Sequence, residues 1–401
     1  MVENTLTIQE LEAAYLARYD LGPGYPQVPV ADYVQSLYMD DTIEDLSLRF
    51  APFWTPEKQA QVDEDLDLAV RRFLRVPVGV GGPVRHTFSG SIALERVLSA
   101  ALREARKQHE FERLNVVTTT PCIDIMRLFL EERADVRPVF VRSNRGGVLG
   151  ALDCDALVDR IANLKRQEPR NPIAVLITSP ENPTGGCWSD ADLLAVAGAC
   201  ADTHAVLLVD HAFAVAGVHD STRLCRIWDL EELPCEWVAI WDTGKTFGLN
   251  EDKLGFIVCN GSAISHAVDE ALAIVQFGVA RRQRMFFAEL LRRATYYGHV
   301  EDLRDVCRAN LATAMELAPQ LVSAAPQAGS LLLLDLKDLD LGDEDARGRL
   351  LDAGVGVVAG NVFFHDDWRP RHLIRVAMAR ESAYFADGIG RLLQVLGAPG
   401  R

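Results

Sequence analysis

The sequence predicts an α/β protein with a large domain, built on a seven-stranded and mostly parallel sheet, and a smaller α/β domain. Short apolar stretches alternate with helical stretches from about residue 84 onward. These apolar stretches lack a polar residue at every second position, which is typical of strands covered on both faces. The length of 401 residues also suits a large domain plus a smaller one better than one simple core.

Each element follows from the local pattern. Seven strands of the large domain are expected at residues 84–88, 115–120, 137–141, 174–179, 205–210, 236–242 and 254–260. Helices are expected at residues 8–18, 56–74, 92–108, 190–203 and 300–321. The second unit has candidate strands at residues 330–336, 354–358 and 373–378. We therefore predict a large domain at residues 50–290 and a small domain formed by residues 1–49 and 291–401.

Composition excludes several classes of protein. The net charge of −16 and a pI near 5.0 argue against nucleic-acid and anionic-membrane partners, which require basic surfaces. No apolar run approaches the ~20 residues that span a bilayer, and the first residues lack a signal pattern. Eight cysteines occur without a Cys-x-x-Cys pair, as expected of reduced thiols in a cytoplasmic protein, and no metal motif is present.

A lysine follows one of the predicted buried strands. Lys245 lies just beyond the apolar segment 236–242, and a lysine at the mouth of a buried strand is costly unless it has a function. Burial favours the neutral amine, which condenses with an aldehyde to give a Schiff base. The alternative is a surface lysine that happens to follow a strand.

Two further polar residues follow neighbouring strands. Asp210 ends the strand at 205–210, and Asn182 begins an Asn-Pro-Thr-Gly sequence after the strand at 174–179. Because ligands of open parallel sheets bind beyond the carboxyl ends of the strands, these side chains are expected to share one site with Lys245. Taken alone, Asp210 could be a helix cap and Asn182 part of an ordinary turn.

An arginine lies within a late apolar strand. Arg375 occurs in the sequence Leu-Ile-Arg-Val-Ala at residues 373–377, which argues against a solvated surface position. A guanidinium binds a carboxylate through two parallel hydrogen bonds. Arg375 is therefore a candidate for binding the carboxylate of a substrate.

With this lysine, aspartate, Asn-Pro-Thr-Gly turn and arginine, the chain resembles the fold type I enzymes of the class I/II aminotransferase superfamily, which use pyridoxal 5′-phosphate. The resemblance implies that Lys245 forms the Schiff base and that Asp210 pairs with the pyridine nitrogen. It implies that Asn182 donates to the phenolic oxygen of the cofactor and that Arg375 binds the substrate α-carboxylate. A homodimer is also implied, because the cofactor of this fold type lies near the dimer interface.

The phosphate of such a cofactor requires small residues and free N–H groups at a helix N-terminus. Ser89, Gly90 and Ser91 open the predicted helix at 92–108, although a serine helix cap has the same sequence. Lys253 stands where most of these enzymes carry a phosphate-binding arginine, and Thr243 is a further candidate.

Two departures concern the cofactor ring. Phe213 occupies the place of a tyrosine whose hydroxyl bonds the phenolic oxygen in aminotransferases. Ile123 stands where an aromatic side chain usually stacks on the ring, so that it offers van der Waals contact instead, or is simply part of the core.

The sequence Asp242-Thr243-Gly244-Lys245 replaces the usual serine pattern before the lysine. It resembles the pyridoxal-phosphate-dependent L-arginine hydroxylases and oxidases of antibiotic pathways, in which the cofactor forms a quinonoid that reacts with O2. The resemblance implies that Asp242 and Glu10 hold a guanidinium. Tyr25 lies where that branch has an Asp-Gly-His loop, and is a candidate substrate contact.

The sequence thus predicts an enzyme that acts on an L-α-amino acid through external aldimine and quinonoid intermediates in secondary metabolism. A buried Asp242 needs a cationic partner, which suits arginine or S-adenosylmethionine as the substrate. Oxidation, hydroxylation and elimination or replacement at the γ-carbon are the possible outcomes. The alternative is a conventional aminotransferase with a 2-oxo acid acceptor, and a remote one is a regulatory protein that senses the cofactor.

Overall fold

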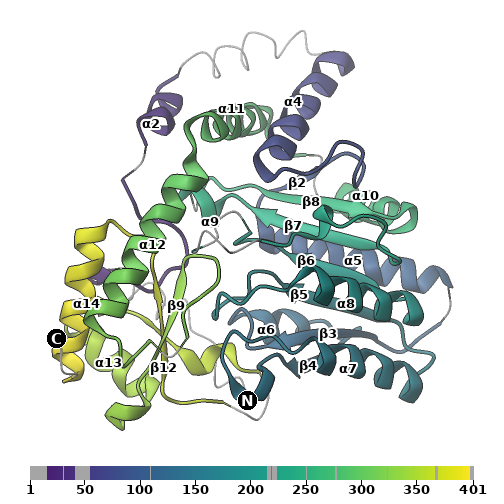
Figure 1. Cartoon of the computed structure of the whole chain (residues 1–401). Coiled ribbons are helices and arrows are strands. Elements are labelled where there is room, and N and C mark those ends of the chain that lie inside the picture. The colour runs from purple at the N-terminus through teal and green to yellow at the C-terminus, as the bar shows by residue number, and fades with distance from the viewer. Residues whose placement is uncertain are drawn as a thin grey trace.

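A seven-stranded sheet forms the centre of the larger part of the molecule (Figure 1). The computed structural model describes residues 16–29, 31–40, 55–108, 110–214, 218, 224–249, 251–275, 278–322, 324–365 and 369–397. The strands are β2 (Arg85–Thr87), β3 (Leu114–Thr120), β4 (Val136–Arg142), β5 (Ile173–Thr178), β6 (Val206–Asp210), β7 (Trp237–Asp242) and β8 (Gly255–Asn260). Their order is β2-β8-β7-β6-β5-β3-β4, and β8 runs antiparallel to both of its neighbours. The predicted mostly parallel sheet is confirmed.

Helices cover both faces of this sheet. One face packs against α5 (Gly90–Gln108), α6 (Met126–Glu131) and α10 (Ser262–Val275). The other packs against α4 (Pro56–Leu74), α7 (Cys154–Gln167), α8 (Asp190–Thr203) and α11 (Arg281–Tyr297). Side chains alternate between the two cores along each strand, so that Leu176 of β5 belongs to the first and Val175 to the second. This double coverage explains the continuous hydrophobic runs in the sequence.

The second unit has its own core and small sheets. Strands β11 (Val358–Ala359), β12 (Leu373–Ala377) and β9 (Leu331–Asp335) form an antiparallel sheet in that order. Strand β1 (Tyr19–Asp20) pairs in parallel with β10 (Val355–Gly356), which attaches the N-terminal segment to this unit. The helices here are α12 (His299–Leu317), α13 (Asp343–Asp352) and α14 (Ser382–Leu396). The division of the chain at residues 49 and 290 stays a prediction.

The remaining described elements are short: α2 (Asp32–Tyr38), α9 (Gly244–Phe247), η2 (Arg145–Gly147), η3 (Ile227–Asp229), η4 (Lys337–Leu339) and η5 (Gly360–Phe363). The helices α4 and α8 have the predicted bounds, whereas α12 ends four residues before the predicted end. Most of the helix expected at residues 8–18 lies outside the described residues. Among the described helices, none combines the length and apolar character that a membrane crossing requires.

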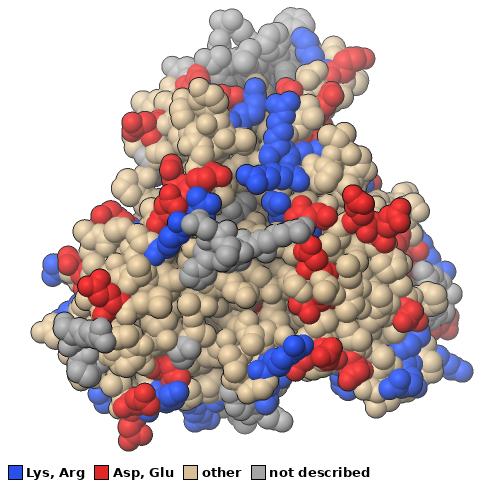
Figure 2. All heavy atoms as spheres, in the orientation of Figure 1, with Lys and Arg blue, Asp and Glu red and all other residues tan. Residues whose placement is uncertain are grey.

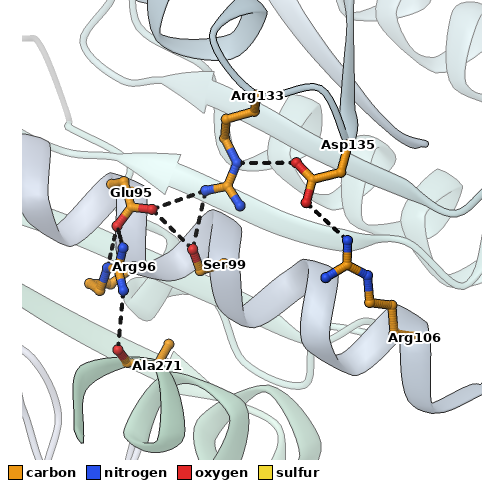
Figure 3. A network of polar contacts seen from close by, with 7 residues as sticks. All are labelled: Glu95, Arg96, Ser99, Arg106, Arg133, Asp135 and Ala271. Atoms are coloured by element: carbon orange, nitrogen blue, oxygen red, sulfur yellow. Dashed lines mark hydrogen bonds and ion pairs between the residues drawn. The ribbon is translucent and has the colours of Figure 1, made fainter. Parts of the chain in front are cut away.

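A polar network fastens helix α5 to the turn between α6 and β4 (Figure 3). Arg133 donates to Glu95 and Ser99 of α5, at 3.1 Å in both cases. Asp135 accepts from Arg106, near the other end of the same helix, at 3.0 Å. These contacts hold α5 along its length and therefore fix the position of its N-terminus, where Gly90 lies.

Acidic and basic side chains are both spread over the face shown in Figure 2. The basic ones gather in the upper middle of this view, in the region that α4 and α11 occupy in Figure 1. Two arginines of α11 are neutralised within the chain, because Arg284 pairs with Asp63 and Arg293 pairs with Glu289. This part of the surface is therefore not a simple anion-binding patch.

Candidate active site

Three neighbouring strands end side by side and bring the predicted residues together. Thr178 of β5 pairs with Asp210 of β6, and Asp210 pairs with Ile240 of β7. The turn with Asn182 follows β5 directly, and α9 with Lys245 follows β7. The site therefore lies at the carboxyl edge of the parallel strands, as the sequence predicted.

The environment of Lys245 favours a neutral amine. Burial lowers its pKa, and the positive charges of Arg375 and Lys253 lower it further, whereas Asp242 and Asp124 act in the opposite direction. An amine with a lowered pKa is a better nucleophile near neutral pH. Charged residues of both units of the molecule therefore influence the pKa of Lys245.

Asp210 has one carboxylate oxygen engaged by the backbone. Its Oδ1 accepts from the N–H of Ala212 at 2.9 Å, which leaves Oδ2 to accept from a ligand. Burial raises the pKa of Asp210 to about 6, Asp242 adds to this effect, and Lys245 opposes it. A buried carboxylate of this kind gains most from a cationic partner.

Asn182 is oriented by the arginine predicted to bind the substrate carboxylate. Arg375 Nη1 donates to Asn182 Oδ1 at 3.1 Å, and both side chains are buried. Because the amide oxygen is occupied in this way, the amide NH2 of Asn182 is the group left to donate to a ligand. This is the donor role that the resemblance implies for Asn182.

Arg375 is also held from two other directions. Its Nη2 donates to the carbonyl of Gly22 at 2.9 Å, and its guanidinium carbon lies 4.8 Å from the ring centroid of Phe363. These contacts fix the plane of the guanidinium before a substrate arrives, which reduces the entropy lost on binding.

The N-terminal loop next to Arg375 is fixed by an arginine that our sequence analysis did not assign. Arg380 is fully buried and donates to the carbonyls of Asp20, Pro23 and Tyr25 at 2.8, 2.8 and 2.9 Å. The loop therefore keeps the carbonyl of Gly22 in place for Arg375. Tyr25 is partly buried in this loop, and burial raises the pKa of its phenol.

Phe213 fills an apolar contact between the two units. It belongs to a small cluster with Leu331 and Ala377 of the second unit. Its Cζ lies 3.5 Å from the point where a Cβ on Gly24 would be, so the N-terminal loop closes over the end of the ring. A tyrosine hydroxyl would extend from this Cζ toward the loop, which gives a packing reason for phenylalanine at this position.

The predicted phosphate cradle contains a carboxylate. The N–H of Gly90, at the start of α5, donates to Asp242 Oδ2 at 2.8 Å, and the N–H of Gly244 donates to Asp242 Oδ1 at 2.7 Å. A Cβ on Gly90 would come within 3.0 Å of the Asp242 Cβ. Only glycine permits this approach, and Asp242 holds one of the amides that a phosphate would use.

The other predicted phosphate residues differ in their surroundings. Ser89 Oγ accepts from the N–H of Ile92 at 3.2 Å and so acts as a helix cap, while Ser91 is exposed. Thr243 is fully buried, and its hydroxyl accepts from the N–H of Leu254 at 2.9 Å. Lys253 lies close enough to influence the pKa of Lys245. Their contacts with phosphate stay predictions.

Ile123 contacts a loop of the second unit. Its carbonyl accepts from His365 Nε2 at 3.2 Å, and its side chain packs against the core that contains α5. The next residue, Asp124, contributes negative charge at Lys245 and was not predicted as part of the site. Glu10 lies outside the described residues.

Two other buried groups near Asn182 were also missed. Glu181 accepts from Ser143 at 2.7 Å and from Thr184 at 2.6 Å, and burial raises its pKa to about 7. His211 Nδ1 donates to the carbonyl of Ser179 at 2.8 Å, its Nε2 accepts from the N–H of Ile227, and burial lowers its pKa to about 4. An acidic residue inside the Pro-x-Asn-Pro turn was the available signal for Glu181.

This fold and this arrangement of lysine, aspartate, asparagine and arginine define a pyridoxal-phosphate-dependent enzyme of fold type I. The family model for aminotransferase class I and II matches residues 148–389, which is more than half of the chain. The protein therefore belongs to this family, and pyridoxal 5′-phosphate is its cofactor.

Several solved structures share the fold over nearly the whole chain. MppP, solved after soaking with its product 2-ketoarginine, is 20% identical with a TM-score of 0.66, over 94% of this chain and 99% of that one. The aromatic aminotransferase from Pyrococcus horikoshii OT3 is 18% identical with a TM-score of 0.74, over 97% and 98% of the chains. A mutant of Thermus thermophilus aspartate aminotransferase is 18% identical with a TM-score of 0.72, over 94% and 95%. No curated protein sequence matches the chain.

The residues present fit the cofactor. Lys245 supplies an amine, Asp210 retains an oxygen for a ring nitrogen, and Asn182 retains its NH2 for a ring oxygen. At the N-terminus of α5 the fit to the phosphate is weaker than at the ring, because the N–H of Gly90 already donates to Asp242. When bound, pyridoxal 5′-phosphate supplies an electron sink for a bond broken at the substrate Cα.

Proposed function

We propose that this enzyme transforms an L-α-amino acid with a positively charged side chain, such as arginine or S-adenosylmethionine, in secondary metabolism. The observation that carries the proposal is the distribution of charge around Lys245. Arg375 contributes a buried cation on one side, and Asp124 and Asp242 contribute carboxylates. An amino acid with an anionic end and a cationic end complements this arrangement.

The residues of the chain have distinct roles in this proposal. Arg375 binds the α-carboxylate, because its guanidinium is already fixed by Asn182 and Gly22. Lys245 Nζ, whose pKa is lowered by burial, moves the proton at the substrate Cα. Asp210 keeps a proton on the ring nitrogen of the cofactor. The loop with Tyr25, held by Arg380, covers the substrate side and excludes water.

Similarity in fold to MppP, whose structure was solved with its product 2-ketoarginine, supports a cationic amino acid as the substrate. The identity of residue 213 also supports a reaction other than simple amino transfer, because phenylalanine cannot supply the hydroxyl that the family resemblance places at the cofactor oxygen.

Conventional transamination with a 2-oxo acid acceptor is the second candidate. It is favoured by the family itself and by similarity in fold to the aromatic and aspartate aminotransferases described above. Lys245, Asp210 and Asn182 would serve this reaction equally well. The two candidates differ in the role of Asp242, which would meet a cationic substrate group in the first and only cap the N–H groups of Gly90 and Gly244 in the second.

The test is a substrate screen of the purified enzyme with its cofactor. L-Arginine, S-adenosylmethionine, L-glutamate, L-aspartate and L-phenylalanine are supplied separately, and dissolved O2, 2-oxo acid and amino transfer to 2-oxoglutarate are measured together. We expect turnover of a cationic amino acid and a lower kcat/KM for it in Asp242→Ser. Efficient, reversible amino transfer from neutral or acidic amino acids, unaffected by Asp242→Ser, would contradict the proposal.

We further propose that the enzyme is a cytoplasmic homodimer in which each site is completed by the other subunit. The family relationship supports the dimer, and the eight cysteines, all free, are consistent with a reducing compartment. Light scattering coupled to size-exclusion chromatography at micromolar concentration measures the mass. A fully active monomer would contradict this assembly.

A further inference from the structure

A cavity lies at the edge of the large sheet opposite to the edge that carries Lys245. It measures about 350 Å³ and is lined by residues at the amino-terminal ends of the strands, among them Leu114, Ile173 and Val206. A six-residue strand such as β7 spans roughly 17–20 Å. The cavity is therefore separated by the length of the sheet from Lys245.

Two thiols line this cavity. Cys200 lies in the last turns of α8 and is fully buried, whereas Cys235, just before β7, is partly exposed. The backbone brings both to the start of β6, because Ala205 N–H donates to the carbonyl of Cys200 at 2.8 Å and Leu207 N–H donates to that of Glu236 at 3.0 Å. Both thiol groups line the same cavity, close enough to influence each other's pKa.

The two thiols differ in acidity. Their interaction lowers the pKa of Cys235 and, together with burial, raises the pKa of Cys200. The thiolate is the nucleophilic form of cysteine, and its reactivity also depends on access. Cys235 combines the lowered pKa with partial exposure, and Cys200 lies in contact with it.

We propose that Cys200 and Cys235 form a redox-reactive dithiol, which a hydroperoxide converts into an intramolecular disulfide. The Cys235 thiolate attacks the peroxide, the O–O bond breaks, and a sulfenic acid forms on Cys235. The Cys200 sulfur then attacks the Cys235 sulfur, the S–O bond breaks, and water leaves with the proton of Cys200. Two thiols and one hydrogen peroxide thus give one disulfide and two waters, and the peroxide is the oxidant.

The disulfide links the end of α8 to the segment that leads into β7. These segments already share the start of β6 through the backbone hydrogen bonds described above, which place the two cysteines on neighbouring segments. The site is remote from Lys245 and independent of the substrate of the enzyme.

The test uses the enzyme with its cofactor and hydrogen peroxide. Intact mass spectrometry should show the loss of two hydrogen atoms, reversed by dithiothreitol, and non-reducing peptide mapping should show a peptide that joins Cys200 to Cys235. Cys187→Ser is the matched control, because Cys187 is also partly exposed, and it should form the same disulfide.

In Cys200→Ser, the mass loss should disappear and dimedone should label Cys235 as a sulfenic acid. If this variant does not fold, Cys235→Ser and the wild-type peptide map still decide the question. Oxidised protein without a Cys200–Cys235 peptide, or dimedone labelling of Cys187 in preference to Cys235, would overturn the proposal.

Discussion

The two ends of the cofactor site differ in how closely they follow the aminotransferase pattern. At the ends of β5, β6 and β7, Asn182, Asp210 and Lys245 offer a donor, an acceptor and an amine, which are the groups we propose for the cofactor ring. At the N-terminus of α5, the amide of Gly90 is already bonded to the Asp242 carboxylate. The three polar residues of the ring end follow the family pattern, although Phe213 and Ile123 beside them do not, and the phosphate end departs from the pattern through Asp242.

The ring end and the phosphate end of the site serve different functions in the enzyme. In the proposed function, the residues at the ring end act in the bond breaking at the substrate Cα. The phosphate end only holds the cofactor. A residue there, such as Asp242, can therefore lower the affinity for the cofactor and still serve the enzyme through another function. A carboxylate beside a phosphate reduces binding through repulsion, which implies that Asp242 has a second role.

The largest effect is expected at the ring end, in Lys245→Ala. Loss of the amine removes the proton carrier at Cα, and kcat should fall about 10²–10⁴-fold. Borohydride should fix the cofactor on Lys245 in the wild-type protein and on no residue of the variant. Lys337→Ala, at an exposed lysine, is the control. A variant that still shows the same reducible adduct would remove Lys245 from its assigned role.

Arg375→Ala should weaken amino-acid binding while the cofactor stays bound. Loss of a bidentate charged pair costs on the order of 2–4 kcal/mol, which raises the dissociation constant about 30- to 1,000-fold. Arg375→Lys should retain part of the affinity, because a lysine supplies charge without the fork. Titration of the absorbance change with substrate measures this, and Arg371→Ala, at an exposed arginine, is the control. Unchanged affinity in Arg375→Ala would contradict the assignment.

Glu181→Gln tests the buried carboxylate next to Asn182. Burial raises its pKa from 4.5 to about 7, so its contribution to stability is full below about 4.5 and is lost as the pH rises through about 7. Because glutamine does not ionise, Glu181→Gln should not lose this stability. Above neutral pH it should be more stable than the wild type by on the order of 1–3 kcal/mol. Urea unfolding across this range measures it, with Glu316→Gln at an exposed site as the control. Parallel pH profiles for wild type and Glu181→Gln would refute the interpretation.

The smallest effect is expected at the phosphate end, in Asp242→Ser. A serine removes the repulsion and offers a hydroxyl, so affinity for pyridoxal 5′-phosphate should rise by about 1 kcal/mol, or roughly 5-fold. Equilibrium dialysis of the cofactor measures this, with Asp252→Ser at an exposed position as the control. If Asp242→Ser binds the cofactor as the wild type does, or less tightly, the comparison between the two ends loses its basis.

Much of the ring end was predictable from the sequence, because its residues follow directly after apolar strands whose ends meet at one edge. The parallel order of β5, β6 and β7 then requires Asn182, Asp210 and Lys245 to be neighbours. The family resemblance supplied their roles.

The phosphate end was not predictable in the same way. The contact between Gly90 and Asp242 joins residues 152 positions apart, and no local pattern specifies it. Arg380 was missed because its partners are backbone carbonyls, which every residue has and which the sequence does not distinguish. Cys200 and Cys235 likewise meet only through the way α8 and β7 flank β6.

The hydrogen bond between Arg375 and Asn182 makes the two binding events of the site thermodynamically linked. One amide serves the residue that binds the substrate carboxylate and the residue assigned to the cofactor oxygen. If the cofactor changes the affinity for a carboxylate ligand by some factor, that ligand must change the affinity for the cofactor by the same factor. A simple carboxylate that is not a substrate should therefore alter the equilibrium affinity of the enzyme for its cofactor.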